Sequence, residues 1–62
     1  MTTKQIATKV LNIAIENAGY RIQNRWLANR LNISAAQLSA ALDHLGNQIV
    51  RVRGVAGYIC AA

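Results

Sequence analysis

The sequence predicts one α+β domain with three helices and a small antiparallel sheet. Three observations indicate this class. Apolar residues recur at helical spacing in three segments, capping residues precede two of these segments, and the last quarter of the chain alternates apolar and polar residues around glycines. Since the chain has 62 residues, we expect a single domain.

The first helix is expected over residues 3–18. Thr2 and Gln5 have capping-box spacing at its start, and Gly19 would end it. Its apolar arc is wider than one buried stripe requires. Two interpretations remain open: the helix is the central one of the domain and is covered on two sides, or its edge with Leu11 and Ile15 is a dimer contact.

A short strand over residues 20–22 and a helix over residues 25–31 are expected next. Asn24 is a candidate N-cap for this helix. We expect Tyr20 and Trp26 to be core or rim aromatics. A base-stacking role for Trp26 would require it to be exposed beside basic residues.

A tight turn at Asn32-Ile33-Ser34 is expected to separate that helix from another over residues 35–45. Ser34 and Gln37 have the second capping-box spacing of the chain. The apolar residues after the turn repeat at i, i+3, i+4 and i+7, so they face the same core as the preceding helix. They are Leu38, Ala41, Leu42 and Leu45.

The end of the chain predicts a β-hairpin over residues 48–61. Gly54 and Gly57 bracket a two-residue tip between segments rich in strand-forming residues. A lone hairpin is marginally stable in water, so the segment 20–22 would pair with it as a third strand.

Period-two alternation then assigns the two faces of the hairpin. If Val50 and Val52 face the core, Arg51 and Arg53 stand on the open face, with no acidic residue nearby in sequence. This arrangement would leave both arginines available to an anionic partner.

The two helices and the turn between them carry a known residue pattern. Its members are Leu27, Ala28, Leu31, Ile33, Ser34, Leu38, Ser39 and Leu42. The pattern resembles the helix-turn-helix of DNA-binding proteins, with Asn32 at a place where glycine is usual; asparagine also tolerates the left-handed conformation. Together with the order helix, strand, helix, helix, hairpin, the whole chain is similar to a minimal winged-helix-turn-helix domain.

The resemblance implies that the helix over 35–45 enters the major groove of double-stranded DNA and that the hairpin, the wing, lies along the neighbouring backbone or minor groove. The groove-facing set would include Ala35 and Asp43. The residues that we expect to contact DNA are Arg25, Ser34, Ala36, Gln37, Ser39, Ala40, His44, Arg51 and Arg53.

This helix is weak as a reader of bases. Gln37 can pair with adenine and Ser39 with a groove edge or a phosphate, but the helix offers no arginine for guanine. Asp43 would repel phosphates unless it accepts from a cytosine amine or pairs with a nearby arginine. We therefore expect binding dominated by the DNA backbone, with modest sequence preference.

The charge balance favours a polyanionic partner. Lys and Arg number seven against two acidic residues, which gives a formal charge of +5 and a pI near 10.4. The expected function is that of a small DNA-binding protein, a transcriptional regulator of bacterial or mobile-element type.

The hydrophobic content, 53% of the residues, exceeds what so small a domain can bury. We expect part of this surface to be shared in a homodimer or higher homo-oligomer, or with a following domain. An alternative function is a protein-interaction module on the same fold, because Ala36 and Ala40 leave a smooth helix face. A further alternative is that the chain is the N-terminal domain of a larger protein.

Several classes are disfavoured by composition. With one histidine, one cysteine and two carboxylates, no catalytic set can be assembled, so we expect no enzyme activity, no metal, no cofactor and no small-molecule substrate. Cys60 is interpreted as a small apolar residue. No apolar run approaches the roughly 18 residues that span a bilayer, and no signal peptide is evident, so a cytoplasmic protein is expected. If it binds DNA, it would be nucleoid-associated.

Overall fold

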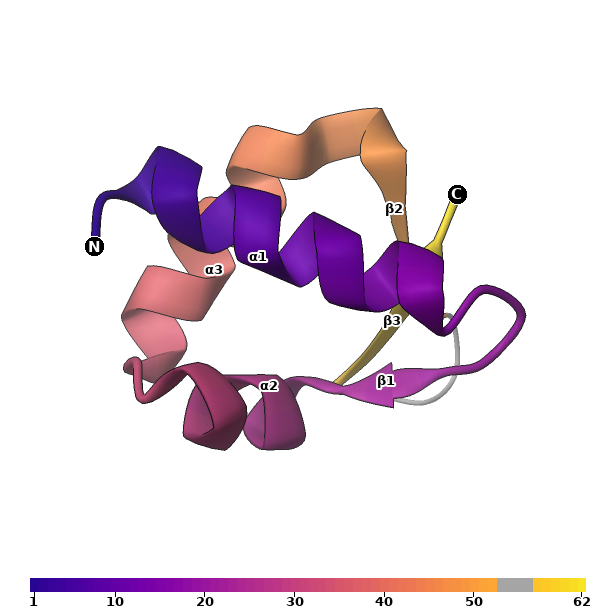
Figure 1. The fold of residues 1–62 in the computed structure, drawn as a ribbon, viewed down its shortest axis with the longest axis horizontal. Coiled ribbons are helices and arrows are strands. Elements are labelled where there is room, and N and C mark those ends of the chain that lie inside the picture. The colour runs from indigo at the N-terminus through magenta and orange to yellow at the C-terminus, as the bar shows by residue number, and fades with distance from the viewer. Residues whose placement is uncertain (53–56) are drawn as a thin grey trace.

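The computed structural model describes residues 1–52 and 57–62, and these residues form three α-helices and three strands (Figure 1). The elements are α1 (Thr3–Glu16), β1 (Ile22–Gln23), α2 (Asn24–Leu31), α3 (Ala35–Leu45), the 3-10 turn η1 (Gly46–Gln48), β2 (Ile49–Arg51) and β3 (Tyr58–Ala61). The strands form one antiparallel sheet in the order β1-β3-β2. The predicted α+β class, with three helices and a small antiparallel sheet, is therefore confirmed.

Helix α1 begins with the predicted capping box but ends earlier than predicted. The Thr2 side chain accepts from the N–H of Gln5, and the Gln5 side chain accepts from the N–H of Thr2. At the other end, both the backbone N–H and the Nδ2 of Asn17 donate to the carbonyl of Ile13, at 3.1 and 2.8 Å. Asn17 is the C-cap, with φ −110° and ψ 33°, so the helix ends at Glu16 and the predicted end at residue 18 is wrong.

The sheet presents one buried face. Ile22 lies opposite Ile59 and Ile49 lies opposite Ala61, and the three isoleucines are in the core. The strand predicted over residues 20–22 is wrong at its start, because Tyr20 lies in a bend and is 72% exposed.

The face assignment predicted for β2 is wrong. Ile49, which follows η1 directly, takes the core position, and Val50 points outward with 48% of its surface exposed. Alternation then places Arg51 on the same side of the strand as Ile49, towards the helices. Arg53, the other arginine expected on the open face, lies outside the described residues.

An aliphatic core joins the helices to the sheet. Helix α1 packs mainly on α3 and also contacts β3 (Figure 1). The buried core residues are Ile6, Ala7, Val10, Ala14, Ile22, Leu27, Leu38, Ala41, Leu42, Leu45, Ile49 and Ile59. Tyr20 and Trp26 do not belong to this set, and both are exposed, so the two aromatic side chains lie at the surface and not in the core.

The α1 edge predicted as one possible dimer contact is incompletely covered within the single chain. Leu11 is half-buried against the core, whereas Ile15 is 57% exposed. The α1 surface buried in the chain consists of Ile6, Ala7, Val10 and Ala14. A second chain at Leu11 and Ile15 therefore stays a prediction.

Candidate nucleic-acid interface

The chain turns sharply between α2 and α3 because Asn32 adopts the left-handed conformation, with φ 54° and ψ 50°. The N–H of Asn32 donates to the carbonyl of Asn29 at 3.3 Å, and the N–H of Ile33 donates to that of Ala28 at 3.0 Å. This is the hydrogen-bond pattern of a Schellman helix end. Since Ile33 also packs against the core, the corner holds α3 at a defined angle to α2.

Ser34 and Gln37 form the predicted capping box at the start of α3. The N–H of Ser34 donates to Oε1 of Gln37 at 2.9 Å, and the N–H of Gln37 donates to Oγ of Ser34 at 3.1 Å. A bidentate contact to adenine needs both Oε1 and Nε2 of Gln37. Because Oε1 already accepts from the N–H of Ser34, a bidentate contact to adenine would have to use the second lone pair of this oxygen while the side chain stays in the cap.

The side of α3 opposite the core is exposed along its whole length. Leu38, Ala41, Leu42 and Leu45 form the buried stripe. Every residue expected to face the DNA groove is exposed. These residues are Ala35, Ala36, Gln37, Ser39, Ala40, Asp43 and His44.

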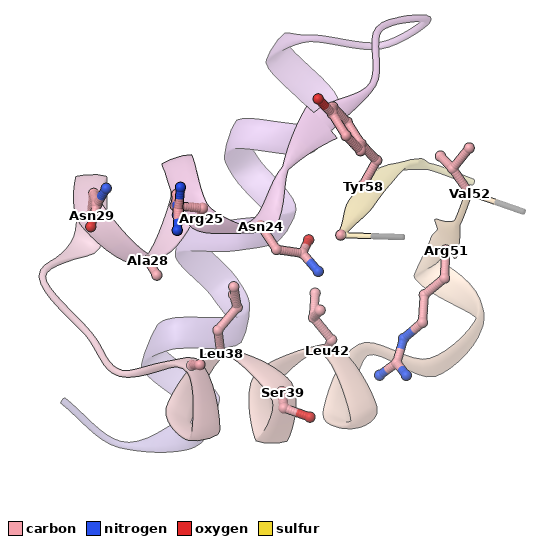
Figure 2. A pocket seen from close by; sticks show the side chains of 12 residues that line it. Asn24, Arg25, Ala28, Asn29, Leu38, Ser39, Leu42, Arg51, Val52 and Tyr58 are labelled. Carbon is pink, nitrogen blue, oxygen red and sulfur yellow. The ribbon is translucent and has the colours of Figure 1, made fainter. Parts of the chain in front are cut away.

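A groove of about 610 Å³ lies between α2, α3 and the ends of β2 and β3 (Figure 2). Its apolar lining comes from Ala28, Ala35, Leu38, Leu42, Val52 and Tyr58. Its polar lining comes from Asn24, Arg25, Asn29, Ser39 and Arg51. The structure thus brings Arg25, Ser39 and Arg51, three of the predicted site residues, to one groove from three different elements.

Arg51 pairs with Asp43 across the gap between β2 and α3. Nη2 of Arg51 lies 2.7 Å from Oδ1 of Asp43, and the two side chains are 58% and 71% exposed. So exposed a pair contributes little to stability, at most about 1 kcal/mol. The consequence of the pair is electrostatic, because Arg51 neutralises the one carboxylate of α3. Pairing with a nearby arginine was one of the two alternatives predicted for Asp43.

The other basic residues are spread over different surfaces. Arg25 lies in the first turn of α2 at the groove, whereas Arg30 lies in the last turn of that helix. Lys4 and Lys9 line a separate hollow on α1. Arg21 lies beside Trp26 on another hollow. Two of the described basic residues, Arg25 and Arg51, therefore line the groove.

Asn24, predicted as an N-cap, also lines the groove. It is the first residue of α2 and Gln23 is the N-cap, so the predicted capping role is wrong. Its backbone N–H instead donates to the carbonyl of Gly57 at 2.6 Å. Its Oδ1 is buried and has no hydrogen-bond partner among the described residues. Asn29 and Tyr58, which also line the groove, were not predicted either.

The comparisons add no further constraint on function. A scan against protein-family models and searches of curated proteins and of solved structures found no match. In residues 1–52 and 57–62, no group of three His, Cys, Asp or Glu side chains could hold a metal ion. No helix in the same residues is long and apolar enough to cross a membrane.

Proposed function

We propose that this chain is a winged-helix DNA-binding protein, a transcriptional regulator of bacterial or mobile-element type that inserts α3 into the major groove of double-stranded DNA. The observation that carries the proposal is the exposed, small-residue face of α3, with Arg25 and Arg51 at the groove beside it. A basic frame around a helix of small residues suits a duplex, whose phosphates border each groove.

The small side chains of α3 support close approach to the base edges. Ala36 and Ala40 are exposed and carry only methyl groups, which can contact a thymine methyl. Ser39, which also lines the groove beside α3, can donate to a phosphate or a base edge. Since most of the affinity would then come from phosphate contacts, the sequence preference is modest.

A salt titration of duplex binding tests this function. Neutralising about four to six phosphates predicts that log K falls with log salt with a slope of roughly −4 to −5. The measurement is fluorescence anisotropy of a labelled duplex at a series of salt concentrations. An affinity that does not respond to salt would overturn the proposal.

The alternative is a protein-interaction module on the same fold, with the homodimer as its simplest form. The observation that favours it is the exposed apolar side chain of Ile15 beside the half-buried Leu11. Gel filtration and a mobility shift with random duplex separate the two functions. Self-association or partner capture without any shift would favour the interaction module.

A further inference from the structure

The aromatic residues of this chain all lie outside its core. The chain has one tryptophan, two tyrosines and no phenylalanine, and the core is entirely aliphatic. Tyr20 is 72% exposed, Trp26 is 48% exposed and Tyr58 is half-buried. Large aromatic side chains are normally the largest contributors to a small core, so their placement at the surface suggests a binding role.

The three aromatic side chains border one surface, the outer face of the sheet. Gln23 lies opposite Tyr58 and Val50 lies opposite Cys60, so alternation places all four side chains on the face away from the core. In Figure 2 the ring of Tyr58 accordingly points away from α3.

Arg21 joins two hollows on this surface. One, of about 480 Å³, is lined by Tyr20, Val50 and Cys60 among others, and its neighbour, of about 350 Å³, is lined by Trp26 and Tyr58. Arg21 borders both hollows, and among residues 1–52 and 57–62 no acidic side chain lines either of them. We call the surface formed by Tyr20, Arg21, Trp26, Val50, Tyr58 and Cys60 the aromatic face.

We propose that the aromatic face binds single-stranded nucleic acid, with bases stacked on Tyr20, Trp26 and Tyr58 and the backbone held by Arg21. Exposed aromatic rings beside a cation are the elements with which proteins hold single strands, because every base offers a π-face and every nucleotide a phosphate. A second copy of the chain is a poorer occupant: like faces would place Arg21 near Arg21 with no carboxylate between them.

This site adjoins the proposed duplex surface, because Arg51, Val52 and Tyr58 each line the groove beside α3 and also one of the two hollows. The two surfaces nevertheless have residues of their own. Arg25 and Ser39 line the groove beside α3 and neither hollow of the aromatic face, whereas Tyr20, Arg21 and Trp26 do not line that groove. Variants at these residues can therefore separate the two activities.

Trp26, the one tryptophan of the chain, reports directly on the aromatic face. The intact chain is titrated with an oligothymidylate of about ten nucleotides, long enough to cover one stacking platform. We expect saturable quenching of the Trp26 fluorescence by the oligonucleotide and none by a blunt duplex. Tyr20→Ala should weaken oligonucleotide binding about 5-fold to 100-fold, measured by anisotropy of the labelled strand. Circular dichroism verifies that this exposed substitution leaves the fold intact.

Arg21→Gln and Lys9→Gln form a matched pair, because each removes one positive charge and only Arg21 borders the aromatic face. We expect Arg21→Gln to weaken oligonucleotide binding about 10-fold and Lys9→Gln about 2-fold or less, since a distant surface charge is screened by salt. If both variants lose the same oligonucleotide affinity and Trp26 is not quenched, net charge alone holds the strand, and the proposal is overturned. Self-association abolished by Tyr20→Ala, with no quenching by oligothymidylate, would overturn it in favour of a second copy.

The failure of this site and the failure of the duplex site give different results. Arg25→Gln should weaken duplex binding and leave oligothymidylate binding within about 2-fold, because it lies off the aromatic face. Loss of single-strand binding in Arg25→Gln, with Tyr20→Ala unaffected, would place the strand at the α3 groove and would overturn the proposal.

Discussion

Asp43 is the residue at which the electrostatics of α3 can be changed most simply. Its carboxylate is 71% exposed on the face proposed to meet DNA, and it occupies Nη2 of Arg51 at 2.7 Å. A phosphate approaching this face would meet the carboxylate and would compete with it for Arg51. Asp43 therefore opposes the affinity of the surface to which it belongs.

Replacing Asp43 by asparagine should strengthen duplex binding. Removing a unit charge near a phosphate in water is worth about 1 kcal/mol, or about 5-fold in affinity. Stability should change by less than about 1 kcal/mol, because the ion pair is exposed. Duplex anisotropy and urea unfolding measure the two effects. If Asp43→Asn binds the duplex more weakly, Asp43 contacts a base or orients Arg51. Arg51→Gln is measured beside it, because it removes the other partner of the ion pair.

At the level of single residues, the local sequence was sufficient to predict the turn between α2 and α3. Asn32 in the left-handed conformation and the Ser34–Gln37 capping box depend on neighbours within five positions, and both predictions are confirmed. Asn24 is different. It is the first residue of α2 and not the N-cap, and its backbone N–H donates to the carbonyl of Gly57, a residue far along the chain.

Substitutions of Ser34 in the capping box can separate the stability of α3 from its proposed binding to DNA. Ser34→Ala removes the acceptor for the N–H of Gln37 and should cost about 1 kcal/mol, or a fall in Tm of about 4–8 °C. Ser34→Asp keeps a good N-cap and suits the helix dipole, so it should preserve stability. It adds a carboxylate beside the proposed DNA surface and should weaken duplex binding about 5-fold.

Thr2→Ala is the matched control for these variants, because Thr2 caps α1 in the same way and α1 is not part of the proposed duplex surface. It should lower the Tm as Ser34→Ala does and leave duplex affinity unchanged at temperatures where the chain is folded. Thermal unfolding and duplex anisotropy on the same samples give both quantities. Unchanged duplex binding by Ser34→Asp would remove the start of α3 from the interface.

The elements differ in how far sequence can predict them. The helical spacing around Leu38 and Leu42 marks α3 unambiguously, since one phase alone buries all its leucines. The β2 segment offers two phases, because both Ile49 and Val50 are apolar. The choice of Ile49 follows from η1 and from the pairing with β3, and neither is encoded locally.

The candidate site shows the same limit. Arg25 and Arg51 were predicted from charge and from the resemblance, but their meeting at one groove depends on how α2 and β2 pack around α3. The aromatic face depends on the register of Gln23 with Tyr58, a pairing of residues that are far apart in the sequence. Sequence spacing alone contains no information on such register.

For the molecule as a whole, the charge of +5 opposes self-association and favours the binding of polyanions. Added salt should therefore strengthen self-association and weaken duplex binding. Raising the salt from about 0.1 M to about 1 M shortens the Debye length from about 10 Å to about 3 Å. If copies meet at Leu11 and Ile15, the dimer fraction should rise while duplex affinity falls. Sedimentation equilibrium and duplex anisotropy at both salt concentrations measure the pair of responses.

Ile15→Gln and Val50→Gln then locate the contact. The two side chains are similarly exposed, at 57% and 48%, but they lie on α1 and on the outer face of the sheet. Burying an exposed isoleucine is worth about 1.5–3 kcal/mol, so Ile15→Gln should weaken self-association by at least about 10-fold. Val50→Gln should leave it unchanged. The reverse result would move the contact from α1 to the sheet, and a chain that stays monomeric at high salt and high concentration would contradict the α1 contact.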